Sequence, residues 1–583
     1  MEVDPKMVKL RVPQQSLPTT SLNLEDTQVT TQLSSVDSSV ANSLVGDDED
    51  TIVTGSLTSR SRSVLSFRPS MNNSNPGRSY DSNDAEFDLI RTLDESLYSV
   101  DGAITKSYVS NEIPDIFDTD IEDVSTKNFF IFTSAGKPVF TMNENDSEST
   151  SYIGLLTSII SYFQVSAEDD IKSFTTEKSK AKFVFLNKTP IFYVAYSQGR
   201  DETKQELNDQ LEFLHSYILS TLTRKQLMRY FEKRQNFDLR SHLESTDFDS
   251  LTEICERFTD KLYPELYLNA LQCLDMRKSM RSKFHKIMAK ELEKMDDMPR
   301  GTLLYSFIIA PNNRICSVLR PKSHTLHPTD LQILFLVIST QFQNLEAQKE
   351  LWIPLCFPKF NSNGYLYCYI KNLINPLESN IAGNTNNPSV IVAISGQKDA
   401  FFKMKMYCDS LIKELQNTKS LLQQLQANIL KPYSVADIPA PLVHHFIFKS
   451  RKHIQYTMPQ LESNSADSYQ KMIYEKKLKL YYQSLENSVT EEMNNNPNKV
   501  AIIFIQWRNE TTTDEIESIK NSTFIKEPIN MLGMAWVTPK FELYLICNNG
   551  IQNKNVALNS ARRIVHWCNK HESRLFINEG AIF

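Results

Sequence analysis

Three kinds of residue in this sequence are of types that often do chemistry: a glycine-lysine pair, paired histidines and cysteines. Gly136-Lys137, within the run Ser134 to Pro138, suggests a phosphate-binding loop. Such a loop has a second glycine five residues earlier and Ser or Thr after the lysine, but here that glycine is missing and Pro138 follows. Short β-type stretches flank the run, so it is better interpreted as a hairpin turn.

The paired histidines have spacings that invite a metal-site interpretation. They are His324/His327, His444/His445 and His566/His571. None has a cysteine or carboxylate at zinc-site spacing. His444 and His445 should point to opposite faces of a strand, so we predict that they cannot share one metal. The sequence also lacks GxSxG and HExxH. We therefore expect no metal, no cofactor and no covalent catalysis.

The eight cysteines are widely spaced and never form a CxxC motif, and the N-terminus has no signal-type apolar run. This pattern predicts a reduced, intracellular protein. The most apolar run, residues 331–338, is far shorter than the roughly 20 residues that span a bilayer. Any membrane contact should therefore be peripheral.

The charge of the chain is unevenly distributed. The 583 residues include 63 Lys and Arg and 70 Asp and Glu, which gives a net charge of −7. Residues 1–120 carry −11 and the remainder +4, so we expect no nucleic acid partner. Basic clusters remain in the C-terminal part, and their candidate membrane-binding residues are Lys449, Arg451, Lys452, Arg562 and Arg563. Each cluster is typical of a solvated surface, but together they could attract anionic lipid.

Residues 1–120 differ from the rest of the chain. They are rich in Ser, Thr, Asn and Asp, contain six aromatic residues and include the acidic run 47–50. Such a segment buries too little apolar surface to offset its ordering entropy, so we predict a disordered acidic tail that carries regulation and is dispensable for folding. Residues 86–98 have helical apolar spacing, which predicts either a partner-binding helix or an unpaired fluctuating one.

From residue 127 the chain repeats one pattern three times: a hairpin, a helix, three strands and a closing helix. The three units occupy residues 125–235, 299–430 and 431–583, and a helical connector occupies 236–298. The pattern predicts an α+β fold in which each unit has a five-stranded antiparallel sheet with flanking helices. Each sheet would leave an edge strand available for pairing with another chain.

Several stretches of the folded part resemble the Mon-one (monensin sensitivity, vacuolar fusion) family. They occur in the family's order and include KNFFIFTSAGKPVFT (127–141), LHPTDLQILFLVIS (326–339), WIPLCFPKFN (352–361), YSVADIP (433–439), HHFIFKS (444–450) and MAWVTPKFELY (534–544). The resemblance spans about 127–583. Polar insertions at 375–388 and 511–530 depart from the family pattern and suggest loops.

The resemblance implies three longin domains and an obligate heterodimer with a Ccz-one-type longin subunit. It implies guanine-nucleotide exchange on a Rab-seven-type GTPase, in endosome maturation and in vacuole, lysosome and autophagosome fusion. It further implies a cytosolic protein recruited to late-endosomal, vacuolar and autophagosomal membranes by anionic phosphoinositides and by an upstream early-endosomal Rab. The alternative is a longin-based trafficking tether or adaptor without exchange activity.

The resemblance also points to candidate contact residues in the first unit. If the family strand order holds, the strand that begins at Ile171 and includes Phe174 lies at the sheet edge and pairs with the partner. A helix beginning at Tyr152 would then face the GTPase, because Tyr152, Leu155 and Leu156 cannot all point inward. Packing of all three in the core is the alternative. Further candidates lie in the polar turn: Ser134, Gly136 and Lys137.

Overall fold

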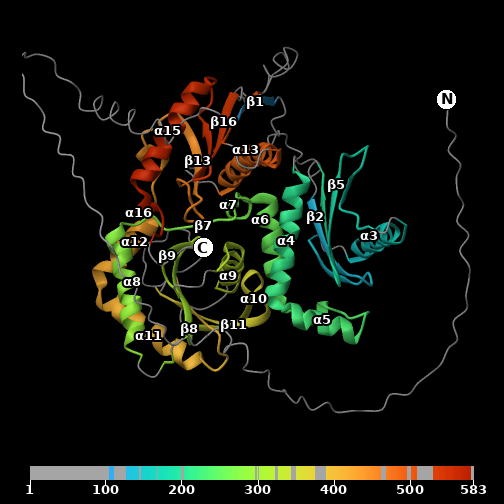
Figure 1. The fold of residues 1–583 in the computed structure, drawn as a ribbon, viewed down its shortest axis with the longest axis horizontal. Helices are drawn as coiled ribbons and strands as arrows, with labels where there is room; N and C mark the ends of the chain where they lie inside the picture. Colours follow the sequence, from blue (N-terminus) through green and yellow to red (C-terminus); the bar gives the residue numbers. More distant parts are fainter. Residues whose placement is uncertain are drawn as a thin grey trace, which may run out of the picture. The chain divides into compact units, whose positions relative to one another are not determined.

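The computed structural model describes residues 104–110, 127–142, 146–166, 169–198, 202–295, 298–299, 301–321, 326–342, 350–373, 389–460, 468–495, 500–508 and 530–578. These residues form three sheets with helices on their faces (Figure 1).

The first sheet is a five-stranded antiparallel sheet in the order β3-β2-β6-β5-β4. The elements of this domain are β2 (Lys127–Thr133), β3 (Pro138–Thr141), α3 (Asp146–Ser166), β4 (Ser173–Thr175), β5 (Lys182–Lys188), β6 (Ile191–Ser197), α4 (Lys204–Thr221) and α5 (Arg224–Lys233). Figure 1 shows α3 and α4 on opposite faces of the sheet. Phe129 and Ile131 belong to the core on the α4 face, and Phe130 and Phe132 to the core on the α3 face. Because both faces are covered, the central strands are continuous apolar runs.

The connector between the first two domains is mostly helical. It comprises η1 (Arg240–His242), α6 (Ser245–Asp260), α7 (Pro264–Leu268), β7 (Leu271–Gln272) and α8 (Lys278–Glu293). The short strand β7 pairs in parallel with β14 of the third domain, and Cys273 forms a bridge with Ile315 of the second. The connector therefore joins the sheets of two domains in addition to linking them in sequence.

The second sheet repeats this topology in the order β9-β8-β12-β11-β10. Its elements are β8 (Leu303–Ala310), β9 (Arg314–Leu319), α9 (Pro328–Phe342), β10 (Glu350–Phe357), α10 (Pro358–Asn361), β11 (Ser362–Asn372), β12 (Val390–Ser395), α11 (Phe401–Asn417) and α12 (Lys419–Leu430). Helix α9 is mostly apolar and is buried on all sides, because every residue from 331 to 338 is buried. It packs against α4 and α6, so the first two domains share one hydrophobic core.

The third sheet contains the order β14-β13-β17-β16-β15, which is the order of the first two. Its elements are η2 (Val435–Asp437), β13 (Val443–Ser450), β14 (Gln455–Thr457), α13 (Ser468–Asn495), β15 (Ala501–Arg508), β16 (Asn530–Val537), β17 (Phe541–Cys547), α15 (Lys554–Lys570) and α16 (Glu572–Leu575). Two strands from elsewhere extend this sheet: β7 beside β14, and β1 (Ile104–Ser110) beside β15. Three successive units of the same strand order confirm the predicted α+β fold.

Strand β1 corrects one prediction. We predicted disorder throughout residues 1–120, yet 104–110 pair with β15 over seven residues. A polar composition limits how many side chains a segment can bury, but β1 is held largely through backbone groups, which every residue carries. The rest of the predicted tail, including the helical pattern at 86–98, lies outside the described residues.

Candidate interaction site

Helix α3 covers one face of the first sheet with only part of its apolar surface. Ile153, Leu156 and Ile160 are buried against aromatic and aliphatic side chains of β2, β5 and β6. These positions have the three- and four-residue spacing of one helix face. The sequence of α3 contains more apolar residues than this face requires.

Except for the half-buried Ile159, the remaining large apolar residues of α3 point to solvent. We define the α3 stripe as Tyr152, Leu155, Tyr162, Phe163 and Val165. Tyr152 is 56% exposed, Leu155 59% and Tyr162 66%. Residues 152, 155 and 162 lie on one side of the helix, rotated away from the buried face. A contiguous group of exposed large apolar side chains is typical of a protein interface.

Strand β4 forms an unpaired edge of the same sheet. It pairs with β5 on one side and has no neighbouring strand among the described residues on the other. The amide of Thr176 donates to Ala181 and that of Phe185 donates to Lys172, each at 2.9 Å. Alternation in an antiparallel pair then leaves the backbone groups of Ser173 and Thr175 pointing outward. This edge can accept another strand.

The aromatic residue of β4 continues an aromatic row across the sheet. The Phe174 and Phe183 rings stack with centroids 4.7 Å apart, and the Phe183 and Tyr196 centroids are 5.0 Å apart. All three side chains are half-buried and pack against the core under α3. Ile171 is also half-buried and lines a small hollow with Ile160 of α3. The side chains of the open edge therefore pack into the core that α3 covers.

The turn between β2 and β3 lies at the other edge of this sheet, where β3 is the outer strand. Gly136 has a φ of +75° and its amide donates to Thr133 at 2.8 Å, so this position favours glycine. A Cβ at Gly136 would lie 3.4 Å from the Thr157 hydroxyl of α3. Ser134 is exposed, and the Lys137 ammonium donates to the Asn236 carbonyl at 3.0 Å. The pairing of β2 with β3 confirms the hairpin interpretation.

The structure places the predicted contact residues at separate parts of the first domain, with the turn beside β3 and with Ile171 and Phe174 at the opposite, β4 edge. It also divides the α3 candidates. Tyr152 and Leu155 are exposed, whereas Leu156 is 3% exposed and belongs to the core. Packing of all three in the core is thus wrong for two residues and right for one. The prediction missed Tyr162, Phe163 and Val165, although the repeat of large apolar residues at 152, 155 and 162 is visible in the sequence.

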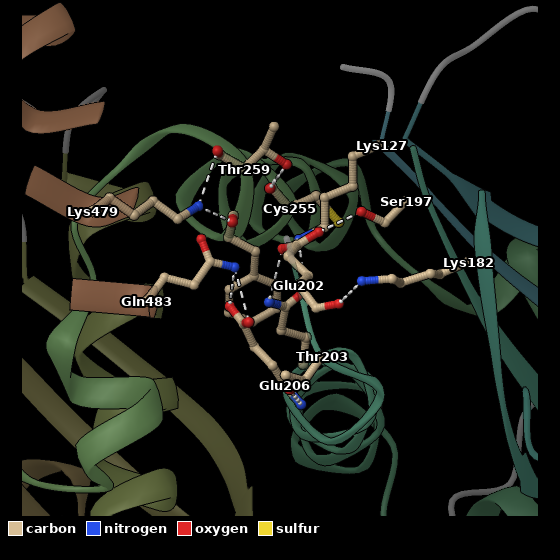
Figure 2. Close-up of polar contacts among 12 residues, drawn as sticks. Lys127, Lys182, Ser197, Glu202, Thr203, Glu206, Cys255, Thr259, Lys479 and Gln483 are labelled. Atoms are coloured by element: carbon tan, nitrogen blue, oxygen red, sulfur yellow. Dashed lines mark hydrogen bonds and ion pairs between the residues drawn. The ribbon is translucent and has the colours of Figure 1, made fainter. Parts of the chain in front are cut away.

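A buried polar network lies on the other face of the first sheet, where the chain enters α4 (Figure 2). The Lys127 ammonium pairs with the Glu202 carboxylate and donates to the Gln210 side chain at 2.8 Å. The Ser197 hydroxyl donates to the second Glu202 oxygen at 2.6 Å. Both charged side chains are essentially inaccessible to solvent. A buried pair of this kind is expensive to break, because it would leave one charge unpaired.

The same network continues to the third domain. The Gln483 amide of α13 donates to both Glu206 carboxylate oxygens at 2.9 and 2.8 Å. The Lys479 ammonium donates to the backbone carbonyls of Phe258 and Thr259 at the end of α6. Figure 2 shows the Glu202 side chain directed toward the first sheet and the Glu206 side chain toward α13. Of two carboxylates four residues apart, Glu202 is thus paired within the first domain and Glu206 makes the contact with the third.

The two carboxylates have opposite pKa shifts. Burial disfavours the charged form of Glu202, but attraction to Lys127 outweighs it and holds the pKa of Glu202 well below its usual range. For Glu206, burial and then the negative charge of Glu202 raise the pKa to about 7. On the sheet side, Lys127 and Glu202 are paired with each other and with neighbouring protein groups. The network therefore has a structural role.

Comparison with known proteins assigns a family to this fold. The first, second and third longin domains of FUZ, MON1 and HPS1 match residues 127–254, 301–413 and 442–572. The vacuolar fusion protein MON1 of Candida glabrata is 58% identical over 98% of both chains. That of Saccharomyces cerevisiae is 48% identical over 86% of this chain and 81% of its own length. The chain belongs to the MON1 family. This membership places it among proteins of vacuole fusion and confirms the predicted longin domains.

The basic candidates of this MON1-family chain differ in their availability to lipid. Lys449 and Arg451 both pair with Glu542, at 3.0 and 2.8 Å. The Lys452 side chain is 74% exposed and lies 3.3 Å from Glu572. Two more candidates on α15 are exposed: Arg562 and Arg563. Across the described residues, none of the helices is both long and apolar enough to cross a bilayer.

The histidine pair of β13 corrects another prediction. His444 and His445 were expected on opposite faces, yet their rings contact Tyr474 and Tyr482 of the same helix, α13, at 2.9 and 2.7 Å. A register shift between Val443 and His445 interrupts the alternation. Burial lowers the pKa of His445 to about 3, so this side chain stays neutral and structural.

Proposed function

We propose that this chain is one subunit of a heterodimeric guanine-nucleotide exchange factor for a Rab-seven-type GTPase of the late endosome and vacuole. Its partner would be a Ccz-one-type subunit built on the same longin plan. The family's place in vacuole fusion supports this function. The complex would act in endosome maturation, autophagy and vacuole fusion, while bound peripherally to the membrane.

The observation that carries the proposal is the combination of two unpartnered surfaces on the first domain. The β4 edge presents backbone groups that suit pairing with a strand of the partner. The α3 stripe is exposed, and so is Ser134 in the turn, which approaches α3 at Thr157. The edge would bind the partner subunit, and the stripe and turn would then contact the GTPase.

Exchange by such a surface makes and breaks no covalent bond. The complex must bind the nucleotide-free GTPase more tightly than the nucleotide-bound one, because equal binding to both states shifts nothing. An acceleration of about 10⁴ requires a barrier lower by about 5.5 kcal/mol. An apolar interface that displaces one switch loop can supply a difference of this size, without a catalytic acid or metal.

The test is nucleotide release from a Rab-seven-type GTPase, measured with the purified heterodimer. Tyr152→Ala and Lys137→Glu should each slow release at least tenfold while leaving the heterodimer intact. Phe402→Ala is the matched control, because Phe402 is an aromatic residue of the second domain that is 74% exposed. It should exchange at the wild-type rate.

Two results would count against the proposal. If both first-domain variants released nucleotide at the wild-type rate, this face would be excluded as the GTPase site. If the wild-type heterodimer bound the GTPase without accelerating release, the alternative of a tether or adaptor would replace exchange. A panel of Rab GTPases in the same assay would define the substrate.

A further inference from the structure

The sheet of the third domain is closed at one edge by a strand from far away in the sequence. Strand β1, Ile104–Ser110, runs parallel to β15, with Ile104 opposite Ala501 and Ser110 opposite Trp507. In Figure 1 the blue strand β1 lies at the margin of the third domain, whose strands are orange and red. The longin unit itself already has its five strands without β1.

Strand β1 contributes little side-chain burial. Residues 105–109 are all exposed, including Tyr108 at 39% and Val109 at 60%. None of the β1 side chains belongs to the hydrophobic clusters of the described residues. One charged contact is present, between Lys106 and Glu492 of α13, and this contact raises the pKa of Lys106. The strand is therefore held by its backbone and one ion pair.

Strand β15 has the opposite character. Every residue from 501 to 507 is buried, with alternate side chains in the cores under α15 and α13. The core of the third domain thus includes the side chains of β15 and none of those of β1. Removal of β1 would expose few apolar side chains but a full row of unpaired backbone groups, which is the arrangement that accepts an added strand.

We propose that the β15 edge is an exchangeable binding site for an extended peptide that runs parallel to β15 and places a cationic side chain opposite Glu492. Residues 104–110 of the same chain are its resident occupant. A peptide of another protein with the same pattern would take their place. The site lies in the third domain and is independent of the exchange function proposed for the first.

Tethering explains how so weakly packed a strand stays bound. A segment attached to the same chain has a high effective concentration near its site, in the millimolar range for short flexible connections. A free peptide must compete with this resident strand. The site should therefore bind added peptide poorly in the wild-type chain and well when the resident strand is disabled.

Backbone geometry supplies a variant and a matched control. The Ile104 amide donates to the Val500 carbonyl at 3.0 Å. Alternation in a parallel pair then directs the amide of Tyr108 toward β15 and the amide of Val109 away from it. Tyr108→Pro removes a bond to β15, whereas Val109→Pro removes an outward amide and keeps the pairing. Both replace an exposed apolar side chain.

The experiment measures binding of a capped, fluorescent peptide of sequence ITKSYVS to the full-length chain by fluorescence polarisation. The peptide should bind Tyr108→Pro at least tenfold more tightly than the wild type or Val109→Pro. A peptide with Glu in place of the lysine should bind at least fivefold more weakly, because it would meet Glu492. Hydrogen exchange of residues 501–508 should speed up in Tyr108→Pro only, and added peptide should reverse the change.

Three outcomes would overturn the inference. Equal peptide affinity for Tyr108→Pro and Val109→Pro would show that the β15 edge is not the binding site. Unchanged hydrogen exchange in Tyr108→Pro would show that β1 does not close this edge. A dimer that dissociates only with Tyr108→Pro would make a second copy of the chain the occupant in place of the chain's own strand.

Discussion

The β4 edge of the first domain and the β15 edge of the third occupy the same place in the longin strand order, yet only the β15 edge is covered by another described strand. Among the described strands, β4 has one neighbour, whereas β15 is covered by β1. β4 spans three half-buried or exposed residues and packs against the core under α3, while β15 spans eight and is almost wholly buried. The long edge would be an aggregation hazard if left open, and the short edge is a restricted docking point.

In the second domain, the equivalent edge strand is β10, and it is blocked in a different way. Strand β10 contains Pro354, which is exposed and has no amide hydrogen to donate. Helix α4 of the first domain also packs against β10. Proline and a covering helix therefore block one edge, and an added strand blocks another. The first domain alone offers an edge to a partner within the described part of the chain.

The buried charge pair at the start of α4 should be the most sensitive point of the first sheet. Lys127→Met leaves the Glu202 carboxylate buried without its cation, so we expect a loss of about 3–5 kcal/mol in the free energy of unfolding. Urea unfolding of the purified chain measures this loss. The double variant with Glu202→Gln should recover part of it. A single variant as stable as the wild type would show that the pair contributes nothing to holding α4 on the sheet.

Blocking the open edge itself is the next largest change. The amide of Thr175 points away from β5, so Thr175→Pro removes a donor to a partner strand and no bond within the sheet. We expect the dissociation constant of the heterodimer to rise at least tenfold, which is about 1.4 kcal/mol. Val109→Pro, with an outward amide at the covered edge, is the control. Equal affinities for the two variants would remove β4 from the dimer interface.

The junction between the first and third domains should respond to pH. Because the pKa of Glu206 is about 7 in the folded chain and the usual carboxyl value is 4.5, the folded state holds the proton more tightly. The stability from this group is then present below pH 4.5 and is lost as the pH rises toward 7. Glu206→Gln should remove this slope and be about 1–2 kcal/mol more stable than the wild type at pH 8. Parallel stability profiles for the two proteins would contradict the shift.

The sequence was sufficient to predict the repeated order of helices and strands in the three domains. It was not sufficient to predict what covers the edges of their sheets. Hairpin, helix and strand order follow from local periodicity, and the apolar runs of β2 and β6 report coverage on both faces. The division of α3 into a buried and an exposed stripe was only partly predictable. Periodicity shows that Tyr152 and Leu155 cannot point the same way as Ile153, but not which group faces the sheet.

Contacts between distant segments were beyond sequence reasoning. The pairing of β1 with β15 joins residues about 400 apart through backbone groups that every residue carries, so ITKSYVS has no local signal for its partner. The link from Glu206 to Gln483 likewise joins two ordinary polar residues of helices. Such contacts depend on the packing of whole domains. Local composition does not report them.

A weaker response is expected at the outer surface of the third domain, away from its covered edge. Lys449 and Arg451 share Glu542, so their charges are partly neutralised, whereas Lys452 is the more exposed cation. An exposed cation contributes about 1 kcal/mol on an anionic membrane, and the nearby Glu572 reduces this contribution. Lys452→Glu should therefore weaken binding to phosphoinositide vesicles only about threefold, and salt should remove the difference.

Lys449→Glu should instead lower stability, because it places a second carboxylate beside Glu542. Unchanged vesicle binding by Lys452→Glu and by Arg562→Glu would return both clusters to ordinary solvated surface, and membrane recruitment would then depend on the partner subunit.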